Sequence, residues 1–185
     1  MTTKLISGKI YIVGDDIDTD QIIPAIHLVY SMKNAEERLN YGKYALSGLP
    51  KEKYPIPFIK EGHESEFSII IAGDNFGCGS SREQAPAALQ IAGIKAVIAK
   101  SYARIFYRNV IDGAFFYPFE FKSKDIFPLK NGDNITIDID QHSILQSKTN
   151  SNFLLGSLGD ARHILESGGI FSYARKQGIS TLTTK

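Results

Sequence analysis

Two short runs of β-branched residues flank a helical segment, and this pattern limits the chain to few folds. Residues 67–72 (Phe-Ser-Ile-Ile-Ile-Ala) and 95–100 (Lys-Ala-Val-Ile-Ala-Lys) predict strands, and residues 84–91 between them predict a helix. A strand–helix–strand unit favours parallel neighbouring strands joined by a right-handed crossover. The sequence therefore predicts an α/β fold with a central, mostly parallel βαβ core.

Further elements are predicted on both sides of this unit. Strands are expected where apolar and polar residues alternate, at residues 8–13 and 134–139, the second of them antiparallel. Two more helices are expected, one over residues 101–111 with Ser101 as N-cap, and one over residues 160–167 capped by Asp160 and stopped by Gly168-Gly169.

One domain accounts for the whole pattern. The 185 residues are 43% hydrophobic and 22% charged, which is ordinary globular composition, and no repeat or linker divides them. Residues 28–66 are broken by glycines and prolines, so a long substrate-loop excursion with at most a short helix near residues 34–39 is expected. The domain is predicted to span residues 1–175, and residues 176–185 are predicted to form a frayed polar tail.

Charge and cysteine content argue against several classes of function. Twenty-one basic and twenty acidic residues give a net charge of +1, so neither nucleic acid nor a membrane is an expected partner. The chain has no signal-peptide pattern and no long apolar run, which predicts a cytoplasmic protein. The single cysteine, Cys78, cannot by itself ligate an iron–sulfur cubane, and the four histidines match no metal-ligand spacing, so no metal site is expected here.

Residues 73–83 (Gly-Asp-Asn-Phe-Gly-Cys-Gly-Ser-Ser-Arg-Glu) form the most informative motif, because they join a predicted strand to a helix. The motif is not a P-loop, since no Gly-Lys-Ser/Thr follows. It is not a dinucleotide fingerprint either, since Arg82 stands where the third glycine belongs. A ligand-binding turn and a purely structural turn both remain open, and the ligand-binding one is favoured.

The start of the following helix decides what Ser80 does. A capping box of Ser80 and Glu83 would put Pro86 in the second helical turn, where proline disrupts a hydrogen bond. The helix is therefore expected to begin at Glu83 or just after. Ser80, Ser81 and Arg82 then lie beside free N–H groups and a positive helix dipole, which suits a carboxylate substrate.

Two other segments carry charged groups. Residues 14–24 contain alternating aspartates ending in Asp20, but the loop lacks the glycine and the glutamate of an EF-hand, so it is either an active-site loop or an Asx-turn. Arg104 and Arg108 fall on one face of a predicted helix, where like charges repel. They are expected to pair with acidic groups within the domain, or to support the substrate or an interface.

Three segments, taken together, resemble the small subunits of 3-isopropylmalate dehydratase, at residues 14–24 (Gly-Asp-Asp-Ile-Asp-Thr-Asp-Gln-Ile-Ile-Pro), 73–83 and 96–109 (Ala-Val-Ile-Ala-Lys-Ser-Tyr-Ala-Arg-Ile-Phe-Tyr-Arg-Asn). Their order and spacing are also similar to the swivelling fourth domain of aconitases. The resemblance covers about residues 9–173. It departs from the family pattern in residues 40–66 and in the tail after residue 175.

The resemblance implies a three-layer β/β/α swivelling domain that closes over a large subunit carrying a [4Fe–4S] cluster, in a heterodimer or heterotetramer. The implied reaction is a hydro-lyase step of leucine biosynthesis, in which a small dicarboxylate, 2-isopropylmalate, is isomerised to 3-isopropylmalate by removal and re-addition of water. By resemblance, Ser80 is the catalytic base and Asp20 the active-site aspartate. Ser81 and Arg82 are the implied substrate-binding residues.

Substrate choice is expected to depend on the residues after the aspartate loop. Family members that act on tricarboxylates place an arginine there, whereas this chain has His27-Leu28-Val29-Tyr30. Leu28 and Val29 would form an apolar wall for an isopropyl group and would leave a third carboxylate without a partner. The alternatives are a homoaconitase or citramalate/methylmalate-type small subunit and, in a different class, a stand-alone binding module.

Overall fold

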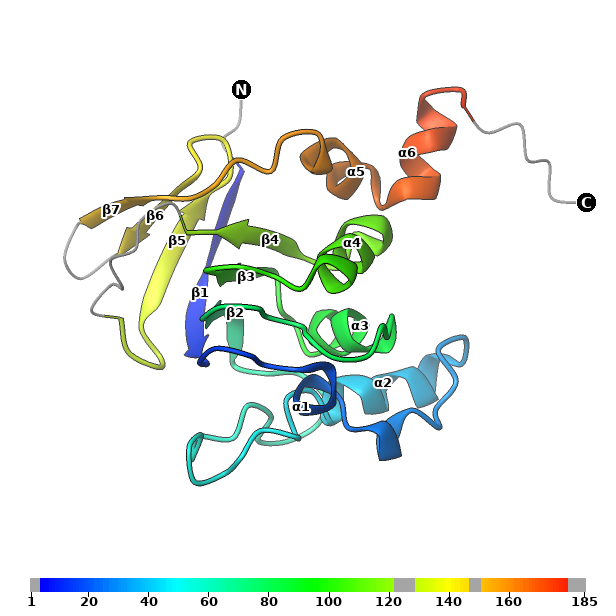
Figure 1. The fold of residues 1–185 in the computed structure, drawn as a ribbon, viewed down its shortest axis with the longest axis vertical. Coiled ribbons are helices and arrows are strands. Elements are labelled where there is room, and N and C mark those ends of the chain that lie inside the picture. The colour runs from blue at the N-terminus through cyan, green and yellow to red at the C-terminus, as the bar shows by residue number, and fades with distance from the viewer. Residues whose placement is uncertain (1–3, 122–128, 147–150, 180–185) are drawn as a thin grey trace, which may run out of the picture.

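The computed structural model describes residues 4–121, 129–146 and 151–179, and Figure 1 shows how their elements are arranged. The strands are β1 (Leu5–Ile12), β2 (Phe67–Ala72), β3 (Ala96–Ala99), β4 (Tyr117–Glu120), β5 (Asn134–Asp138), β6 (Ser143–Gln146) and β7 (Ser151–Leu154). The α-helices are α1 (Thr19–Ile22), α2 (Ala35–Lys43), α3 (Gln84–Ile91), α4 (Arg104–Gly113), α5 (Ala161–Ser167) and α6 (Ile170–Lys176), with a 3₁₀ turn, η1 (Ala25–His27), after α1.

A single sheet holds the seven strands in the order β4-β3-β2-β1-β5-β6-β7. The pairs β1–β2, β2–β3 and β3–β4 are parallel, whereas β5, β6 and β7 add antiparallel strands beyond β1. The predicted βαβ unit is β2–α3–β3, and the predicted α/β class with a parallel core is confirmed. Because the carboxyl ends of parallel strands meet at one edge, the loops after β1, β2 and β3 start side by side.

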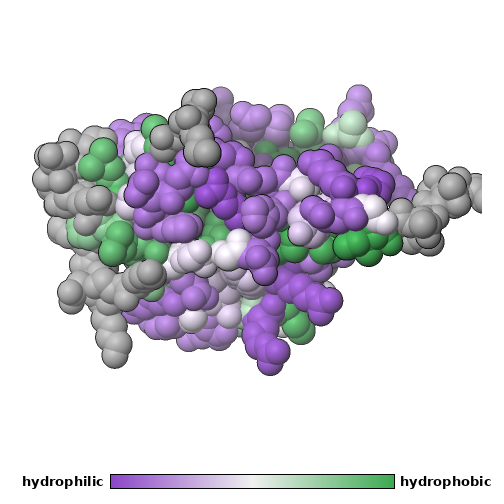
Figure 2. Space-filling view, turned by 90° about the horizontal axis from the view of Figure 1, so that it is seen from above, coloured by the Kyte–Doolittle hydropathy of each residue, from purple (hydrophilic) through white to green (hydrophobic). Residues whose placement is uncertain are grey.

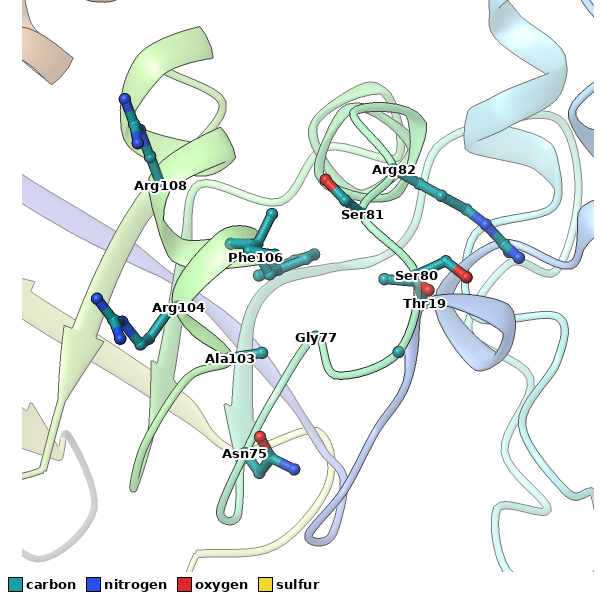
Figure 3. A pocket seen from close by; sticks show the side chains of 12 residues that line it. Thr19, Asn75, Gly77, Ser80, Ser81, Arg82, Ala103, Arg104, Phe106 and Arg108 are labelled. Atoms are coloured by element: carbon teal, nitrogen blue, oxygen red, sulfur yellow. The ribbon is translucent and has the colours of Figure 1, made fainter.

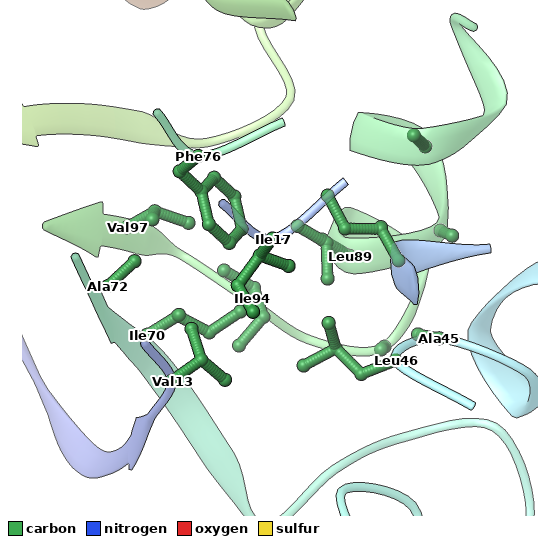
Figure 4. Packing of buried hydrophobic residues seen from close by; sticks show 14 of the residues in the cluster. Val13, Ile17, Ala45, Leu46, Ile70, Ala72, Phe76, Leu89, Ile94 and Val97 are labelled. Atoms are coloured by element: carbon green, nitrogen blue, oxygen red, sulfur yellow. The ribbon is translucent and has the colours of Figure 1, made fainter. Parts of the chain in front are cut away.

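The parallel strands are buried on both faces. Ile70 of β2 and Val97 of β3 face one core, which α1, α2 and α3 cover, and Figure 4 shows its packing. Ile69 and Ile98 on the same strands face a second core, shared with Ile137 and other residues of the antiparallel strands. This alternation follows from the two-residue period of a strand. Helices, parallel strands and antiparallel strands therefore form the three layers β/β/α.

The sheet curls so that its two ends meet. Phe121, just after β4, forms an isolated antiparallel bridge with Leu155, just after β7, and the N–H of Gly156 donates to the carbonyl of Glu120 at 2.7 Å. The curl places the antiparallel strands against the outer face of β2 and β3, which Figure 1 shows on the side opposite α3 and α4. It leaves the carboxyl ends of the parallel strands uncovered by this layer.

Residues 28–66 contain more helix than the sequence predicts. Helix α2 extends to Lys43, beyond the expected end at residue 39. It packs closely on α3, because a Cβ on Gly42 would lie 2.7 Å from Cγ2 of Ile91. The excursion is therefore a packed part of the helical layer, and the absence of a clean sequence period reflects its many turns.

Three expectations about helix ends are wrong. Ala103, not Ser101, is the N-cap of α4, because Ser101 is used to hold two loops together. Asp160 lies at the N-cap position of α5 but its side chain makes no capping hydrogen bond. Gly168 and Gly169 end α5, but α6 begins directly after them and reaches Lys176, inside the predicted tail, whose residues 180–185 lie outside the described part of the chain.

The surface mixes polar and apolar residues. Figure 2, seen from above, shows a mainly hydrophilic face on which hydrophobic atoms form separate patches. Across residues 4–121, 129–146 and 151–179, no helix is long and apolar enough to cross a bilayer.

Candidate functional site

Three loops continue the parallel pairing beyond the ends of β1, β2 and β3. The loop after β1 pairs with the loop after β2, where the N–H of Thr19 donates to the carbonyl of Cys78 and the N–H of Gly77 donates to the carbonyl of Ile17, at 2.8 and 2.7 Å. The loop after β2 pairs in turn with the loop after β3, through the bridge between Phe76 and Tyr102. The acidic, glycine-rich and arginine-containing motifs of the sequence are therefore adjacent in space.

Polar side chains reinforce these loop pairs. Asn75 Nδ2 donates to Asp16 Oδ1 at 2.8 Å, and both residues have positive φ, of 56° and 54°. The Ser101 hydroxyl accepts from the N–H of Asn75 at 2.8 Å and donates to Asp74 Oδ1 at 3.2 Å. Left-handed backbone at non-glycine residues costs free energy, so it persists only where surrounding bonds fix the conformation. The loops are thus held in a defined shape.

A cavity of about 560 Å³ opens between these loops, and Figure 3 shows the residues around it. It is lined by Thr19, Asn75, Gly77, Gly79, Ser80, Ser81, Arg82, Ala103, Arg104, Ile105, Phe106 and Arg108. The loops leading into α3 and α4 both line it, and neither N-cap residue, Glu83 or Ala103, caps its helix with a side chain. Uncapped helix N-termini favour a bound anion.

Arg82 is held by Asp20 from across the cavity. Its Nη1 donates to Asp20 Oδ1 at 2.7 Å and its Nη2 to Asp20 Oδ2 at 3.1 Å, and Nη1 also lies 3.4 Å from the carbonyl of Ile23. The hydrogen bonds from Arg82 lower the pKa of Asp20 below its ordinary value. The Arg82 side chain is only 16% exposed, whereas that of Asp20 is 57% exposed. The aspartate therefore fixes the arginine in a partly buried position.

Ser80 and Ser81 are exposed at the mouth of the cavity. Neither side chain hydrogen-bonds to any residue in the described ranges, so the Ser80–Glu83 capping box does not form. The expectation that α3 begins after Glu83 is confirmed, because α3 starts at Gln84 and Pro86 falls in its first turn. Both hydroxyls are free to contact a ligand.

Gly77 allows α4 to approach the glycine-rich loop. A Cβ at this position would lie 2.1 Å from Cγ of Phe106, and its φ of 80° is one that glycine tolerates best. Phe106 also packs edge-on against Phe76, with ring centroids 5.5 Å apart. This contact sets the distance between the loop and the arginine-bearing start of α4.

Arg104 and Arg108 add positive charge to the cavity wall. Arg108 Nε lies 3.5 Å from Asp112 Oδ2 on the same helix, which is the expected acidic partner within the domain. Arg104 has no ion-pair partner among the residues that the structure describes. The cavity thus has one arginine held by Asp20, one paired along its helix and one without a counter-charge.

Leu28 and Val29 lie outside this cavity. Leu28 is partly buried against the core, whereas Val29 is 78% exposed. They are nevertheless connected to the site, because the N–H of Ala25, which begins η1, donates to Asp20 Oδ1 at 3.3 Å. Val29 is therefore placed to contact a ligand only if that ligand extends beyond the cavity.

Metal ligands are not assembled in this part of the molecule. Within the described ranges, no group of three or more histidine, cysteine, aspartate or glutamate side chains could hold a metal ion. Burial, followed by the charges of Asp18 and Asp16, raises the pKa of the Cys78 thiol. Cys78 is therefore a turn residue without thiolate character.

Thr19 and Phe106 line the cavity although no sequence signal marks them as site residues. Phe106 belongs to a run that matches an ordinary amphipathic helix. Thr19 directly precedes Asp20 and is 2% exposed, so it is recognised only once the two loops are seen to pair. Their positions depend on contacts between segments that are far apart in the chain.

Comparison with known proteins identifies the family. The model of the aconitase C-terminal domain matches residues 17–124, more than half of the chain. The chain belongs to this family. It is 44% identical over 179 residues to 3-isopropylmalate dehydratase small subunit 1 of Arabidopsis thaliana, covering 95% of this chain and 71% of that protein. The fold, the resemblance and the family therefore agree.

Two relatives from Methanocaldococcus jannaschii are nearly as long as this chain. One, named methanogen homoaconitase small subunit, is 39% identical over 176 residues and is covered to 94%, with 95% of this chain aligned. A crystal structure titled 3-isopropylmalate dehydratase is 37% identical, with a TM-score of 0.76 over 95% of this chain and 96% of that one. Because similar identities accompany different names, overall identity alone does not choose the substrate.

The Asp20–Arg82 pair predicts a pH dependence. Because Arg82 lowers the folded-state pKa of Asp20, the pair stabilises the fold above the ordinary aspartate pKa of about 3.9, and this stabilisation is lost as pH falls through the lowered value. In Arg82→Gln the pKa of Asp20 should rise toward about 3.9. Carboxyl ¹³C NMR titration measures it. Arg162→Gln, which removes a partner of the distant Asp140, is the control, and an unmoved Asp20 pKa in Arg82→Gln would contradict the assignment.

Proposed function

We propose that this chain is the small subunit of a 3-isopropylmalate dehydratase, which isomerises 2-isopropylmalate to 3-isopropylmalate by removing and re-adding water. The supporting observation is the cavity in which Ser80, Ser81 and Arg82 face Asp20 and its loop at two uncapped helix N-termini. Such a site suits a dianionic substrate that must lose a proton. The names of the Arabidopsis and methanogen relatives support the same assignment.

A large subunit is the expected partner, since the relatives are named small subunits. The cavity is open, and its rim carries Ser80, Ser81, Arg104 and Ile105, all exposed in the isolated chain. Ile105 is 58% exposed, which is unusual for an isoleucine beside two arginines. We infer that the large subunit covers this rim and completes the wall around the substrate.

The family implies a [4Fe–4S] cluster, and the residues described in this chain do not fit it, because they offer neither three thiolates nor another suitable ligand set. We therefore assign the cluster to the large subunit. There it would supply Lewis-acid chemistry at the substrate hydroxyl. The tasks left to this chain are to bind carboxylate groups and to move the proton next to one of them.

Ser80 is the proposed base. A serine hydroxyl is a poor base in water, so it needs groups that stabilise its alkoxide. The free N–H groups before α3, the positive end of that helix and the guanidinium of Arg82 all lie on the same loop. Because Ser80 makes no hydrogen bond within the described structure, its oxygen is available to the substrate proton.

Arg82 is the proposed carboxylate anchor, and Asp20 is the residue that positions it. A guanidinium has five N–H donors, of which Asp20 and Ile23 take three. The remaining two, on Nε and Nη2, lie on one edge and can bind both oxygens of a carboxylate. Asp20 thus orients the arginine without consuming its binding edge, and Ser81 beside it offers a further donor.

Val29 is the proposed specificity residue. An arginine at this position would bind a third carboxylate, whereas valine provides an apolar surface for an isopropyl group. Its 78% exposure in the isolated chain is consistent with a contact that forms only when the large subunit closes over the substrate. This favours isopropylmalate over homocitrate, although a relative of similar identity is named a homoaconitase subunit.

The decisive test is an absorbance assay of 3-isopropylmalate dehydration, made with this chain alone and after anaerobic mixing with a cluster-loaded large subunit. Activity is expected only in the mixture, because the two chains contribute different parts of the site. Activity of the isolated chain would contradict the divided site. Silence in the mixture, with turnover of homocitrate instead, would replace the proposed substrate.

Ser80→Ala is expected to reduce kcat of the assembled enzyme by roughly 10²-fold or more, the usual contribution of a general base. Assembly with the large subunit should be unchanged, because the side chain makes no hydrogen bond within the described chain. Steady-state kinetics and size-exclusion chromatography measure the two effects. Ser47→Ala, at an exposed serine outside the cavity, is the control, and normal kcat in Ser80→Ala would refute the role.

Val29→Arg is expected to shift the ratio of kcat/KM values toward a tricarboxylate such as homocitrate by roughly tenfold or more, since a hydrogen bond to a charged group contributes about 1.5–3 kcal/mol. Ile26→Arg adds the same charge three residues earlier, at a side chain that is 76% exposed. It serves as the matched control for a general charge effect. Equal ratios in the two variants would count against Val29 as the specificity residue.

A further inference from the structure

Thr19 has a buried hydroxyl that the folded chain does not use. The residue is 2% exposed, and Oγ1 is the buried side-chain nitrogen or oxygen in the described ranges that lacks a hydrogen-bond partner. Its backbone is fully engaged, since the N–H donates to the carbonyl of Cys78 at 2.8 Å and the carbonyl accepts from Ile23 at 2.9 Å. Only the hydroxyl is left over.

The usual structural roles of such a hydroxyl are already taken or are absent. The N-cap of α1 is Asp18, whose Oδ1 accepts from the N–H of Gln21 at 2.7 Å, while Gln21 Oε1 accepts in return from the N–H of Asp18. No bond from the Thr19 hydroxyl to a preceding carbonyl is present either. A buried hydroxyl without a partner destabilises a fold, and an apolar group of the same shape does not. Valine would serve the packing at least as well.

The hydroxyl lies on the wall of the proposed substrate cavity. Thr19 lines it together with Ser80 and Arg82, and Figure 3 shows Thr19 at the side of the cavity where Ser80 lies. Thr19 Oγ1 is 3.3 Å from the point that a Cβ on Gly79 would occupy, and Gly79 directly precedes Ser80. Because glycine leaves that point empty, the hydroxyl is not blocked by the loop that faces it.

We propose that Thr19 is a substrate-binding residue whose Oγ1 donates a hydrogen bond to the substrate carboxylate that Arg82 anchors. The inference rests on the proposed function and adds a residue to it. Thr19 and Asp20 are consecutive in α1, so the residue that orients Arg82 also sets the position of the hydroxyl. A carboxylate is the fitting partner, because a hydroxyl can donate to it while the guanidinium occupies its other lone pairs.

The test compares Thr19→Val and Thr19→Ser in the enzyme assembled with its cluster-loaded large subunit, using 3-isopropylmalate as the probe. Thr19→Val keeps the shape and removes the donor, so KM should rise about tenfold or more while kcat changes less. Thr19→Ser keeps a hydroxyl and should recover most of the lost affinity. Thr136→Val is the matched control, because it removes a hydroxyl that is bonded to Ser7 Oγ at 2.8 Å and lies outside the cavity. Its KM should equal that of the unaltered enzyme.

Thermal unfolding of the isolated chain separates binding from structure. Thr19→Val should unfold at the same temperature as the unaltered chain or higher, whereas a lower unfolding temperature would show an internal partner for the hydroxyl and overturn the inference. An unchanged KM in Thr19→Val would overturn it as well. If the unaltered assembled enzyme does not turn over 3-isopropylmalate, the proposed function itself fails, an outcome distinct from failure of the Thr19 role.

Discussion

The parallel pairing of β1, β2 and β3 is the constraint on which the site depends. Strands that run in the same direction release their chains at the same edge, and here the hydrogen bonding continues past that edge into the loops, from Thr19 to Cys78 and from Phe76 to Tyr102. The antiparallel strands cover one face of the parallel ones and the helices cover the other. The loop edge is therefore the part of the parallel sheet that remains open to a ligand and a partner.

Within this edge the charges are arranged so that positive groups are both held and available. Asp20 holds Arg82 through two hydrogen bonds while leaving one edge of the guanidinium free. Arg104 has no counter-charge within the described structure, and two helices present uncapped N-termini. A chain folded in this way gains from binding an anion, because that anion supplies the missing partners.

The same edge is incomplete by itself, and that agrees with a divided enzyme. Ser80 is exposed, Thr19 carries an unused hydroxyl, and Val29 lies in solvent beyond the cavity. Each of these features would be unfavourable or without purpose in a self-sufficient domain, and each has a purpose if a second subunit closes over a substrate. The family of small subunits to which the chain belongs makes this interpretation coherent.

The sequence by itself determined the α/β class, the β2–α3–β3 unit, the start of α3 and the three motifs, because strand period, proline chemistry and glycine spacing are local properties. It did not determine the helix caps at Ser101 and Asp160, the presence of α6 or the length of α2, since these depend on packing against distant segments. Only the tertiary structure decided that Asp20 pairs with Arg82 and that Thr19 lines the cavity. Those contacts join residues about sixty positions apart, and the pairing of parallel strands is what brings them together.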